Sequence, residues 1–126
     1  MQATRHAIDW FEIPVRDMDR AIAFYEKLLA TTIRRETIAG SALGVIKYDA
    51  EAVGGCLIQG EHVAPPSLEG ALVYLNAGAS LDAVLARVES IGGRITQPKV
   101  TLPGDMGVFA HVADTEGNRV GLHALA

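Results

Sequence analysis

The stretch Asp114-Thr115-Glu116-Gly117-Asn118-Arg119-Val120-Gly121-Leu122 has the pattern of a tight turn that leads into a β-strand. Gly117-Asn118 is a hairpin-turn signal, because both residue types tolerate the backbone conformations that such turns need. Asp114 can hold the turn by accepting hydrogen bonds from its backbone. β-prone segments lie on both sides, at about 106–112 and 118–124. The sequence therefore predicts a closing hairpin in this stretch.

Two segments earlier in the chain have the apolar periodicity of amphipathic helices. The two stripes are Met18, Ile22, Tyr25 and Leu29, and then Leu81, Val84, Leu85 and Val88. Asp17 and Ser80 are expected to cap these helices, because their side chains can accept hydrogen bonds from the free N–H groups of a first turn. Gly92-Gly93 should end the second helix, since glycine accepts the left-handed conformation at a helix C-terminus.

An alternating strand precedes each helix. In the first strand, one face carries Phe11, Ile13 and Val15, and the other carries Trp10, Glu12 and Pro14. In the second strand, the face that corresponds to Phe11 carries Val73, Leu75 and Ala77. The opposite face carries Leu72, Tyr74 and Asn76. Three β-prone stretches follow the first helix, at about 33–38, 43–49 and 53–59. Three more follow the second helix, at about 94–100, 106–112 and 118–124.

The two halves share one spacing. Phe11 and Val73 are 62 positions apart, and so are Ile22 and Val84. This spacing indicates two copies of one βαβββ unit. Pro65-Pro66 breaks regular structure between the copies, so we assign that region to a linker.

We therefore predict a single α+β domain over residues 1–126, with module one at about 5–59, a linker at about 60–70 and module two at about 71–126. Each module should form a curved mixed sheet with one helix on its outer face, and the two sheets should surround a cleft. The helix covers the Phe11 side of the first strand. The opposite side, which carries Trp10, should therefore line the cleft.

The composition excludes several classes of function. A net charge of −4 and scattered basic residues give no electrostatic footprint for nucleic acid or an anionic membrane. The single cysteine, Cys56, excludes an intrachain disulfide. No segment approaches the roughly 20 apolar residues of a membrane helix, and the first residues lack the apolar run of a signal peptide. We expect a cytoplasmic protein whose partner is a small molecule.

The order and spacing of these motifs resemble the vicinal-oxygen-chelate superfamily, which includes glyoxalase I, extradiol dioxygenases and bleomycin-resistance proteins. Three stretches carry the resemblance: Phe11 to Tyr25, Val73 to Gly93, and Asp114 to Leu122. The resemblance is greatest to small bacterial glyoxalase-related proteins, many without a known substrate. It implies the paired-module fold, and it implies a homodimer, because concave sheets often pair in this superfamily.

In the metal-using members of that superfamily, His, Glu or Gln side chains from the first and last strands of each unit hold a divalent ion. The resemblance places the four ligand positions at Trp10, at Gly55 or Cys56, at Leu72 or Val73, and at Gly121. Only Cys56 offers a ligand atom, and one thiolate without partners is a poor site. We therefore expect no metal and no other cofactor at the usual place. An alternative is a displaced site of His6, Glu12 and His123, which has two-histidine, one-carboxylate composition.

The cleft-facing strands carry the candidate site residues. Glu12 is the candidate general base, because an apolar cleft would raise the pKa of a carboxylate; otherwise it is a solvated residue or the partner of an arginine. The candidate ligand-binding residues are Trp10, Tyr74, Asn76, His111 and His123. Trp10 offers a flat face for a planar ligand, or fills the space of the missing metal. Tyr74 and Asn76 are typical polar markers of a small-molecule pocket, or else satisfy backbone groups.

The sequence thus predicts a glyoxalase-related protein that binds or converts a small molecule. As an enzyme it would be a lyase or isomerase acting on a carbonyl or thiol-adduct metabolite, with Glu12 as base and with Tyr74 and Asn76 orienting the substrate. The alternative is a non-catalytic protein that sequesters a ligand, as bleomycin-resistance members do. A third possibility is an accessory module that binds a partner protein or senses a metabolite. The missing ligand at Gly121 favours sequestration.

Overall fold

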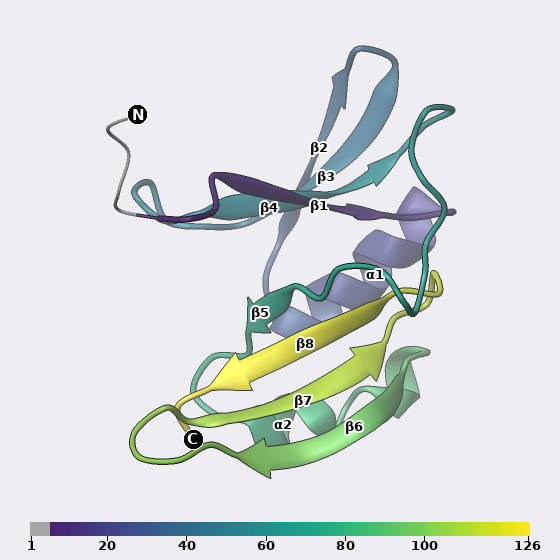
Figure 1. Ribbon diagram of the computed structural model, residues 1–126. Helices are drawn as coiled ribbons and strands as arrows, with labels where there is room; N and C mark the ends of the chain where they lie inside the picture. The colour runs from purple at the N-terminus through teal and green to yellow at the C-terminus, as the bar shows by residue number, and fades with distance from the viewer. Residues whose placement is uncertain (1–5) are drawn as a thin grey trace.

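The computed structural model describes residues 6–126, which form two four-stranded mixed sheets with helices packed on one side of each (Figure 1). The strand orders are β1-β4-β3-β2 and β5-β8-β7-β6. In both sheets the first strand of the module pairs in parallel with the last, and the other neighbours are antiparallel. The predicted α+β fold with two repeated modules is confirmed, and the sheets do not close into a barrel.

The first module contains β1 (Trp10–Pro14), α1 (Met18–Leu29), β2 (Ile33–Ile38), β3 (Ser41–Ile46) and β4 (Gly54–Gln59). The second contains β5 (Tyr74–Asn76), α2 (Leu81–Leu85), a 3-10 helix η1 (Glu89–Ile91), β6 (Arg94–Thr101), β7 (Val108–Ala113) and β8 (Arg119–Ala124). The second α-helix is shorter than its apolar stripe. A 3-10 turn continues its path and ends at Gly92, whose φ of 101° needs glycine. None of the described helices combines the length and apolar character needed to span a membrane.

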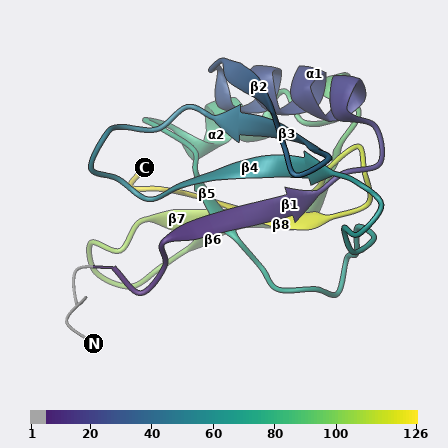
Figure 2. The same cartoon turned by 90° about the horizontal axis from the view of Figure 1, so that it is seen from above.

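Both predicted helix caps are present. Asp17 Oδ1 accepts a hydrogen bond from the backbone N–H of Arg20 at 3.1 Å, and Ser80 Oγ accepts one from Ala83 at 3.2 Å. The buried side of α1 packs on β3 and β4 and joins a core to which both sheets contribute. Both helices lie toward the same side of the molecule (Figure 2). The two modules therefore share one core.

Side chains alternate across the sheets as the sequence predicts. Ile13 is 3% exposed in the core, whereas Trp10, on the other side of β1, is 39% exposed. In β5, Leu75 is 6% exposed and Tyr74 is 47% exposed. Each sheet thus has one side that helices cover and one uncovered side, which no helix covers. On the uncovered side of the first sheet, Leu43, Val45 and Cys56 are nevertheless buried. We name the uncovered side of the second sheet the open face; its residues include Tyr74, Asn76, Phe109, His111, Arg119 and His123.

The closing hairpin, residues 114–118, connects the second module to the start of α1. Glu116 Oε1 accepts hydrogen bonds from the backbone N–H groups of Arg16 and Asp17, both at 2.8 Å. Glu116 also forms an ion pair with Arg20, with 2.7 Å between Oε2 and Nε. A carboxylate at this place satisfies free N–H groups at the helix N-terminus and complements its dipole. The hairpin therefore caps a helix of the other module.

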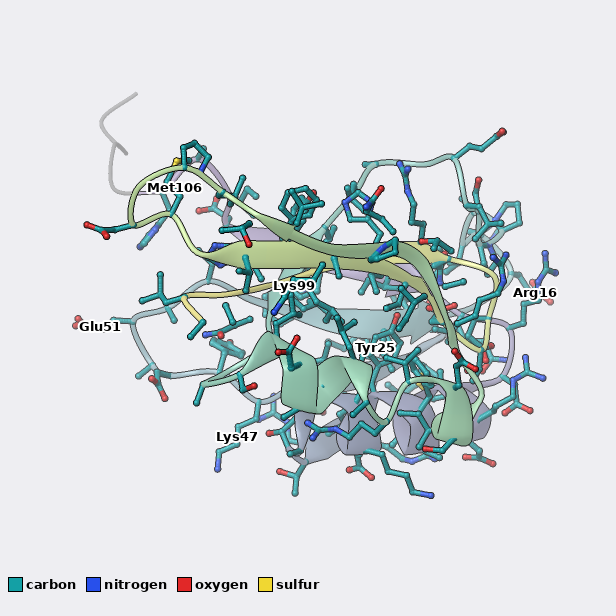
Figure 3. The ribbon with its side chains drawn as sticks, turned by 90° about the horizontal axis from the view of Figure 1, so that it is seen from below. Arg16, Tyr25, Lys47, Glu51, Lys99 and Met106 are labelled. Atoms are coloured by element: carbon teal, nitrogen blue, oxygen red, sulfur yellow. The ribbon has the colours of Figure 1, made fainter. Side chains whose placement is uncertain are left out.

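Two further hydrogen bonds join the modules, one of them buried and the other partly buried. The Tyr25 hydroxyl donates to Asp114 Oδ2 at 2.6 Å, and Asn118 Nδ2 donates to Pro14 O at 2.7 Å. Figure 3 shows Tyr25 in the interior of the molecule. Burial, followed by the charge of Asp114, raises the pKa of Tyr25 well above its ordinary value. The predicted role of Asp114 in the turn is confirmed, because its Oδ1 accepts from the N–H groups of Glu116 and Asn118.

Candidate functional site

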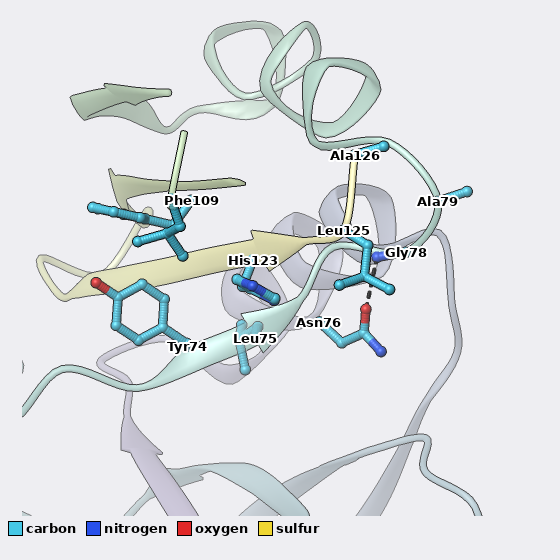
Figure 4. A pocket seen from close by; sticks show the side chains of 10 residues that line it. Tyr74, Leu75, Asn76, Gly78, Ala79, Phe109, His123, Leu125 and Ala126 are labelled. Carbon is cyan, nitrogen blue, oxygen red and sulfur yellow. Dashed lines mark hydrogen bonds between the residues drawn. The ribbon is translucent and has the colours of Figure 1, made fainter. Parts of the chain in front are cut away.

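A pocket of about 850 Å³ lies on the open face, beside the end of β5 (Figure 4). It is lined by Tyr74, Leu75, Asn76, Gly78, Ala79, Leu102, Phe109, His123, Leu125 and Ala126. We name it the open-face pocket. Its volume is typical of small-molecule sites, and so is a mainly apolar and aromatic lining with few polar groups. Three of the predicted ligand-binding residues, Tyr74, Asn76 and His123, come together here.

Tyr74 lies across the neighbouring strand. It pairs in register with Gly121 of β8, and a Cβ atom at Gly121 would lie 2.3 Å from Tyr74 Cδ1. The hydroxyl of Tyr74 reaches β7, where it is 2.7 Å from His111 Nε2. No side chain other than hydrogen could stand at position 121 without displacing the ring. The glycine therefore makes room for the tyrosine.

His111 holds the hydroxyl end of Tyr74. Burial, with a smaller contribution from the charge of Arg119, lowers the pKa of His111, so its neutral form dominates at pH 7. A neutral ring with its proton on Nδ1 accepts the hydroxyl hydrogen at Nε2. Phe109 packs against both rings, with centroids 5.9 Å from Tyr74 and 5.5 Å from His111. The three rings form one aromatic cluster beside the pocket.

Asn76 and His123 supply polar groups to the pocket. Asn76 Oδ1 accepts a hydrogen bond from the Gly78 N–H at 2.9 Å, so the Nδ2 amide of Asn76 is left to donate (Figure 4). His123 Nε2 lies 2.6 Å from the Met106 carbonyl oxygen. Because a carbonyl only accepts, Nε2 carries the proton, and a neutral ring keeps Nδ1 as an acceptor. The pocket therefore offers both a donor and an acceptor.

The other two candidates lie on the uncovered side of the first sheet. Trp10 packs edge-on against Tyr48, with ring centroids 5.8 Å apart. Glu12 is exposed and lines a separate pocket of about 250 Å³ together with Arg119. The structure does not bring Glu12 into the pocket that contains Tyr74 and Asn76. Glu12 therefore lies apart from Tyr74 and Asn76, which were expected to orient its substrate, and its role as a base stays a prediction.

The ligand positions that the resemblance implies do not suit a metal. Cys56 packs in a small apolar cluster with Leu43 and Val45, and burial raises the pKa of its thiol. Gly55 faces the other way, where a Cβ atom would meet the ring of Phe11. A protonated thiol in an apolar cluster is a poor ligand.

At the equivalent place in the second module, the ring of Tyr74 fills the space beside Gly121. Within residues 6–126, no group of three or more His, Cys, Asp or Glu side chains could hold a metal ion. His6, Glu12 and His123 therefore do not form the displaced site considered above. Within residues 6–126, the side chains at the superfamily's ligand positions are therefore a poor set for a divalent ion, and the absence of a metal stays a prediction.

Seven of the ten residues that line the pocket were not predicted, among them Phe109 and Leu125. Phe109 joins the aromatic cluster, and its alternation with His111 along β7 was a signal that could have identified it. Leu125 lines the pocket from beyond the end of β8, where no periodicity applies. Segments outside regular structure carry no facing information in the sequence.

Solved structures share this fold. A glyoxylase/bleomycin resistance protein/dioxygenase domain from Frankia sp. EAN1pec aligns with a TM-score of 0.71 at 16% identity, over 95% of this chain and 98% of that one. The antibiotic-binding protein TnmS3 from Streptomyces sp. CB03234 aligns with a TM-score of 0.66 at 24% identity, over 98% of this chain and 97% of that one. A glyoxalase I mutant from Zea mays aligns with a TM-score of 0.65 at 22% identity, over 92% of this chain. The match covers 46% of the maize chain, so this chain spans about half of that protein's length.

The sequence also matches one family model along nearly all of its length. No curated protein sequence matches this chain. The model for the Glyoxalase/Bleomycin resistance protein/Dioxygenase superfamily matches residues 7–122, which include both modules and the closing hairpin. The chain therefore belongs to the Glyoxalase/Bleomycin resistance protein/Dioxygenase superfamily.

Proposed function

We propose that this protein binds a small planar molecule in the open-face pocket and releases it unchanged. The observation that carries the proposal is the position of Tyr74, whose ring lies over Gly121 and is held at its hydroxyl by His111. An exposed aromatic ring that is already ordered loses little conformational entropy when a ligand stacks on it. The aromatic cluster is therefore a preformed wall for a flat ligand.

The lining of the pocket matches such a ligand. Tyr74 and Phe109 offer aromatic surface, and each well-placed aromatic contact contributes about 0.5–1.5 kcal/mol beyond its buried area. The Asn76 amide and His123 Nδ1 provide a donor and an acceptor that would orient polar groups at the ligand's edge. The resemblance of the whole fold to an antibiotic-binding protein supports a natural product or drug as the ligand class.

The same geometry argues against a reaction in this pocket. Glu12, the candidate base, lines a different pocket, and among the family's ligand positions only Cys56 carries a ligand atom, which lies in an apolar cluster. Tyr74 and His123 are acid–base groups among the lining residues, and both are engaged: the Tyr74 hydroxyl by His111, and His123 Nε2 by the Met106 carbonyl. Binding a ligand without converting it requires only the aromatic and polar groups that the pocket already contains.

The proposal is tested by calorimetric titration of the protein with planar aromatic antibiotics and dyes, followed by mass spectrometry of the recovered ligand. We expect saturable binding, an unchanged ligand mass, and about tenfold weaker binding by Tyr74→Ala, which corresponds to about 1.4 kcal/mol. Tyr48→Ala is the matched control, because Tyr48 is similarly exposed but lies on the first module outside this pocket. Turnover of the ligand, or of methylglyoxal with glutathione, would overturn the proposal.

We also infer that two copies associate. The uncovered sides of both sheets expose large aromatic side chains, with Trp10 at 39% and Tyr74 at 47% exposure. A homodimer is the commonest way for a soluble protein to cover such surface. Light scattering after size-exclusion chromatography measures the mass, and a monomer at micromolar concentration would contradict the inference.

A further inference from the structure

A second pocket lies between the two modules. It has a volume of about 250 Å³ and is enclosed by β1, by the segment between the modules and by the start of β8. Its lining includes Glu12, Pro14, Pro65, Val73, Asn118 and Arg119. We name it the inter-module pocket. It shares none of these residues with the open-face pocket.

The walls of the inter-module pocket are tied together. Asn118 Nδ2 donates to Pro14 O at 2.7 Å, and Asn118 Oδ1 accepts from the Ser67 N–H at 3.3 Å. The backbone N–H of Arg119 donates to Ser67 O, also at 3.3 Å. These bonds hold β1, the linker and β8 around one space. The pocket is therefore preformed, and a ligand would not have to order it.

Arg119 lines this pocket and has one side-chain donor that lacks an acceptor among the described residues. Its Nε is buried and has no hydrogen-bond partner among residues 6–126. The ion pairs within the same residues involve Arg20, Arg34, Arg35 and Lys99 instead. A buried donor without a partner costs about 1–3 kcal/mol, and more when the group is charged. An anion in the pocket would contact the terminal nitrogens of the Arg119 guanidinium and would compensate its charge, which offsets part of that cost.

Glu12 supplies the opposite charge. Glu12 and Arg119 are the ionisable residues in the described lining, and they form no ion pair with each other. The rest of the lining is mainly Ala, Pro, Val, Ile and Gly. Arg119 and Glu12 thus line the pocket beside small apolar residues. The guanidinium of Arg119 can donate hydrogen bonds to a ligand, and the exposed carboxylate of Glu12 can accept them.

The size of the pocket limits the ligand. A volume of about 250 Å³ is roughly eight times the 30 Å³ that a water molecule occupies in the liquid. The volume therefore favours a molecule of roughly ten heavy atoms or fewer over a polycyclic compound. The ligand must also carry an anionic group for Arg119 and a donor group for Glu12.

We propose that the inter-module pocket binds a small apolar α-amino acid, with its carboxylate on Arg119 and its ammonium group on Glu12. Arginine binds carboxylates through charge-assisted hydrogen bonds, which are stronger than neutral ones. Glu12 acts here as a recognition residue, which differs from the base expected from the sequence. The small apolar lining residues select a short apolar side chain on the amino acid. This assignment is independent of the ligand in the open-face pocket.

The test is NMR titration of the whole protein with glycine, L-alanine and L-valine at low salt, with acetate and ethylamine as half-ligands. We expect saturable shifts around Arg119 with a Kd of about 1 mM or tighter for at least one amino acid, and at least tenfold weaker binding of both half-ligands. Glu12→Gln should weaken amino-acid binding about tenfold while leaving the binding of acetate unchanged.

Arg119→Gln should abolish amino-acid binding, and Arg119→Lys, which keeps the charge but lacks Nε, should weaken it at least tenfold. Arg94→Gln is the matched control, because Arg94 lies on the same sheet outside the pocket. Absence of saturation by any of the three amino acids up to about 10 mM would overturn the proposal, as would equal binding by Arg119→Gln. Equally tight binding of acetate and glycine would overturn the zwitterion assignment. Tyr74→Ala should leave this binding intact, which separates the result from that for the open-face pocket.

Discussion

The ring of Tyr74 occupies the space into which a side chain at Gly121 would project. The two residues are partners across β5 and β8, and a Cβ atom at position 121 would stand 2.3 Å from Tyr74 Cδ1. Such a distance is far shorter than the roughly 3.5–4.0 Å of an ordinary carbon contact. The glycine and the tyrosine are therefore coupled: a change at one position alters the position of the other.

Gly121→Ala is expected to displace the Tyr74 ring and to break its hydrogen bond to His111. Overpacking of this kind costs about 1–3 kcal/mol of stability, and the ligand of the open-face pocket should bind as weakly as it does to Tyr74→Ala. Urea unfolding and calorimetric titration measure the two effects. Gly70→Ala is the control, because a Cβ atom there meets nothing within 4 Å. Wild-type affinity in Gly121→Ala would show that the ring position is unimportant for binding.

Acid should destabilise the protein through Glu116. Burial alone would raise the pKa of Glu116, but the hydrogen bonds from Arg20, from the Asp17 N–H and from other donors outweigh it and hold the pKa at about 2. Because the folded pKa lies below the unfolded value of about 4.3, this contribution is complete above that pH and is lost as the pH falls toward 2. The loss is on the order of 3 kcal/mol.

Urea unfolding of the wild type and of Glu116→Gln between pH 2 and pH 7 measures this contribution. The variant should be less stable at pH 7 and should show a smaller loss of stability between about pH 4.3 and pH 2. Parallel pH profiles for the two proteins would contradict the assignment.

Tyr25→Phe should weaken the connection between the modules. The substitution removes the donor to Asp114 Oδ2, which keeps its hydrogen bond from Asn118 Nδ2 at 2.9 Å. Hydrogen bonds to charged groups contribute about 1.5–3 kcal/mol, so we expect a loss within that range in urea unfolding. An exposed tyrosine gives the control, since Tyr48→Phe should change stability by less than about 0.5 kcal/mol. A loss below that value in Tyr25→Phe would contradict the prediction.

Chelation should leave the protein unchanged. The side chains at Trp10, Cys56 and Gly121 do not make a metal site, so treatment with EDTA should alter neither the melting temperature nor the binding of an open-face ligand. Elemental analysis of protein purified without chelators gives the direct measurement. One tightly held equivalent of Ni, Zn, Fe or Mn per chain would overturn this expectation.

The fold could be predicted because its signals are local. The helical stripes, the strand alternation and the turn at Gly117-Asn118 each depend on neighbours a few residues apart. The repeat of 62 positions then ordered the elements into two modules. The facing of Trp10 and Tyr74 also follows from alternation alone, and the structure confirms it.

The arrangement of the site could not be predicted, because it depends on contacts between distant segments. The sequence shows Gly121 as a missing ligand, but the ring that fills its place comes from Tyr74, on a strand that pairs with it only in the fold. Glu12 and Tyr74 have equivalent positions in the two copies, yet they line different pockets. That separation depends on how the shared core places the modules, and no local pattern encodes it.

The hydrogen bond from the Arg16 N–H to Glu116 spans 100 residues and has a consequence for synthesis on the ribosome. Helix α1 leaves the exit tunnel long before the hairpin that caps it has been made. Folding of the first module therefore cannot be completed until residues 114–118 have left the ribosome, because Tyr25 lacks its hydrogen-bond partner Asp114 until then. Folding of this domain is expected to finish in a single late step, because the first half cannot complete its structure alone.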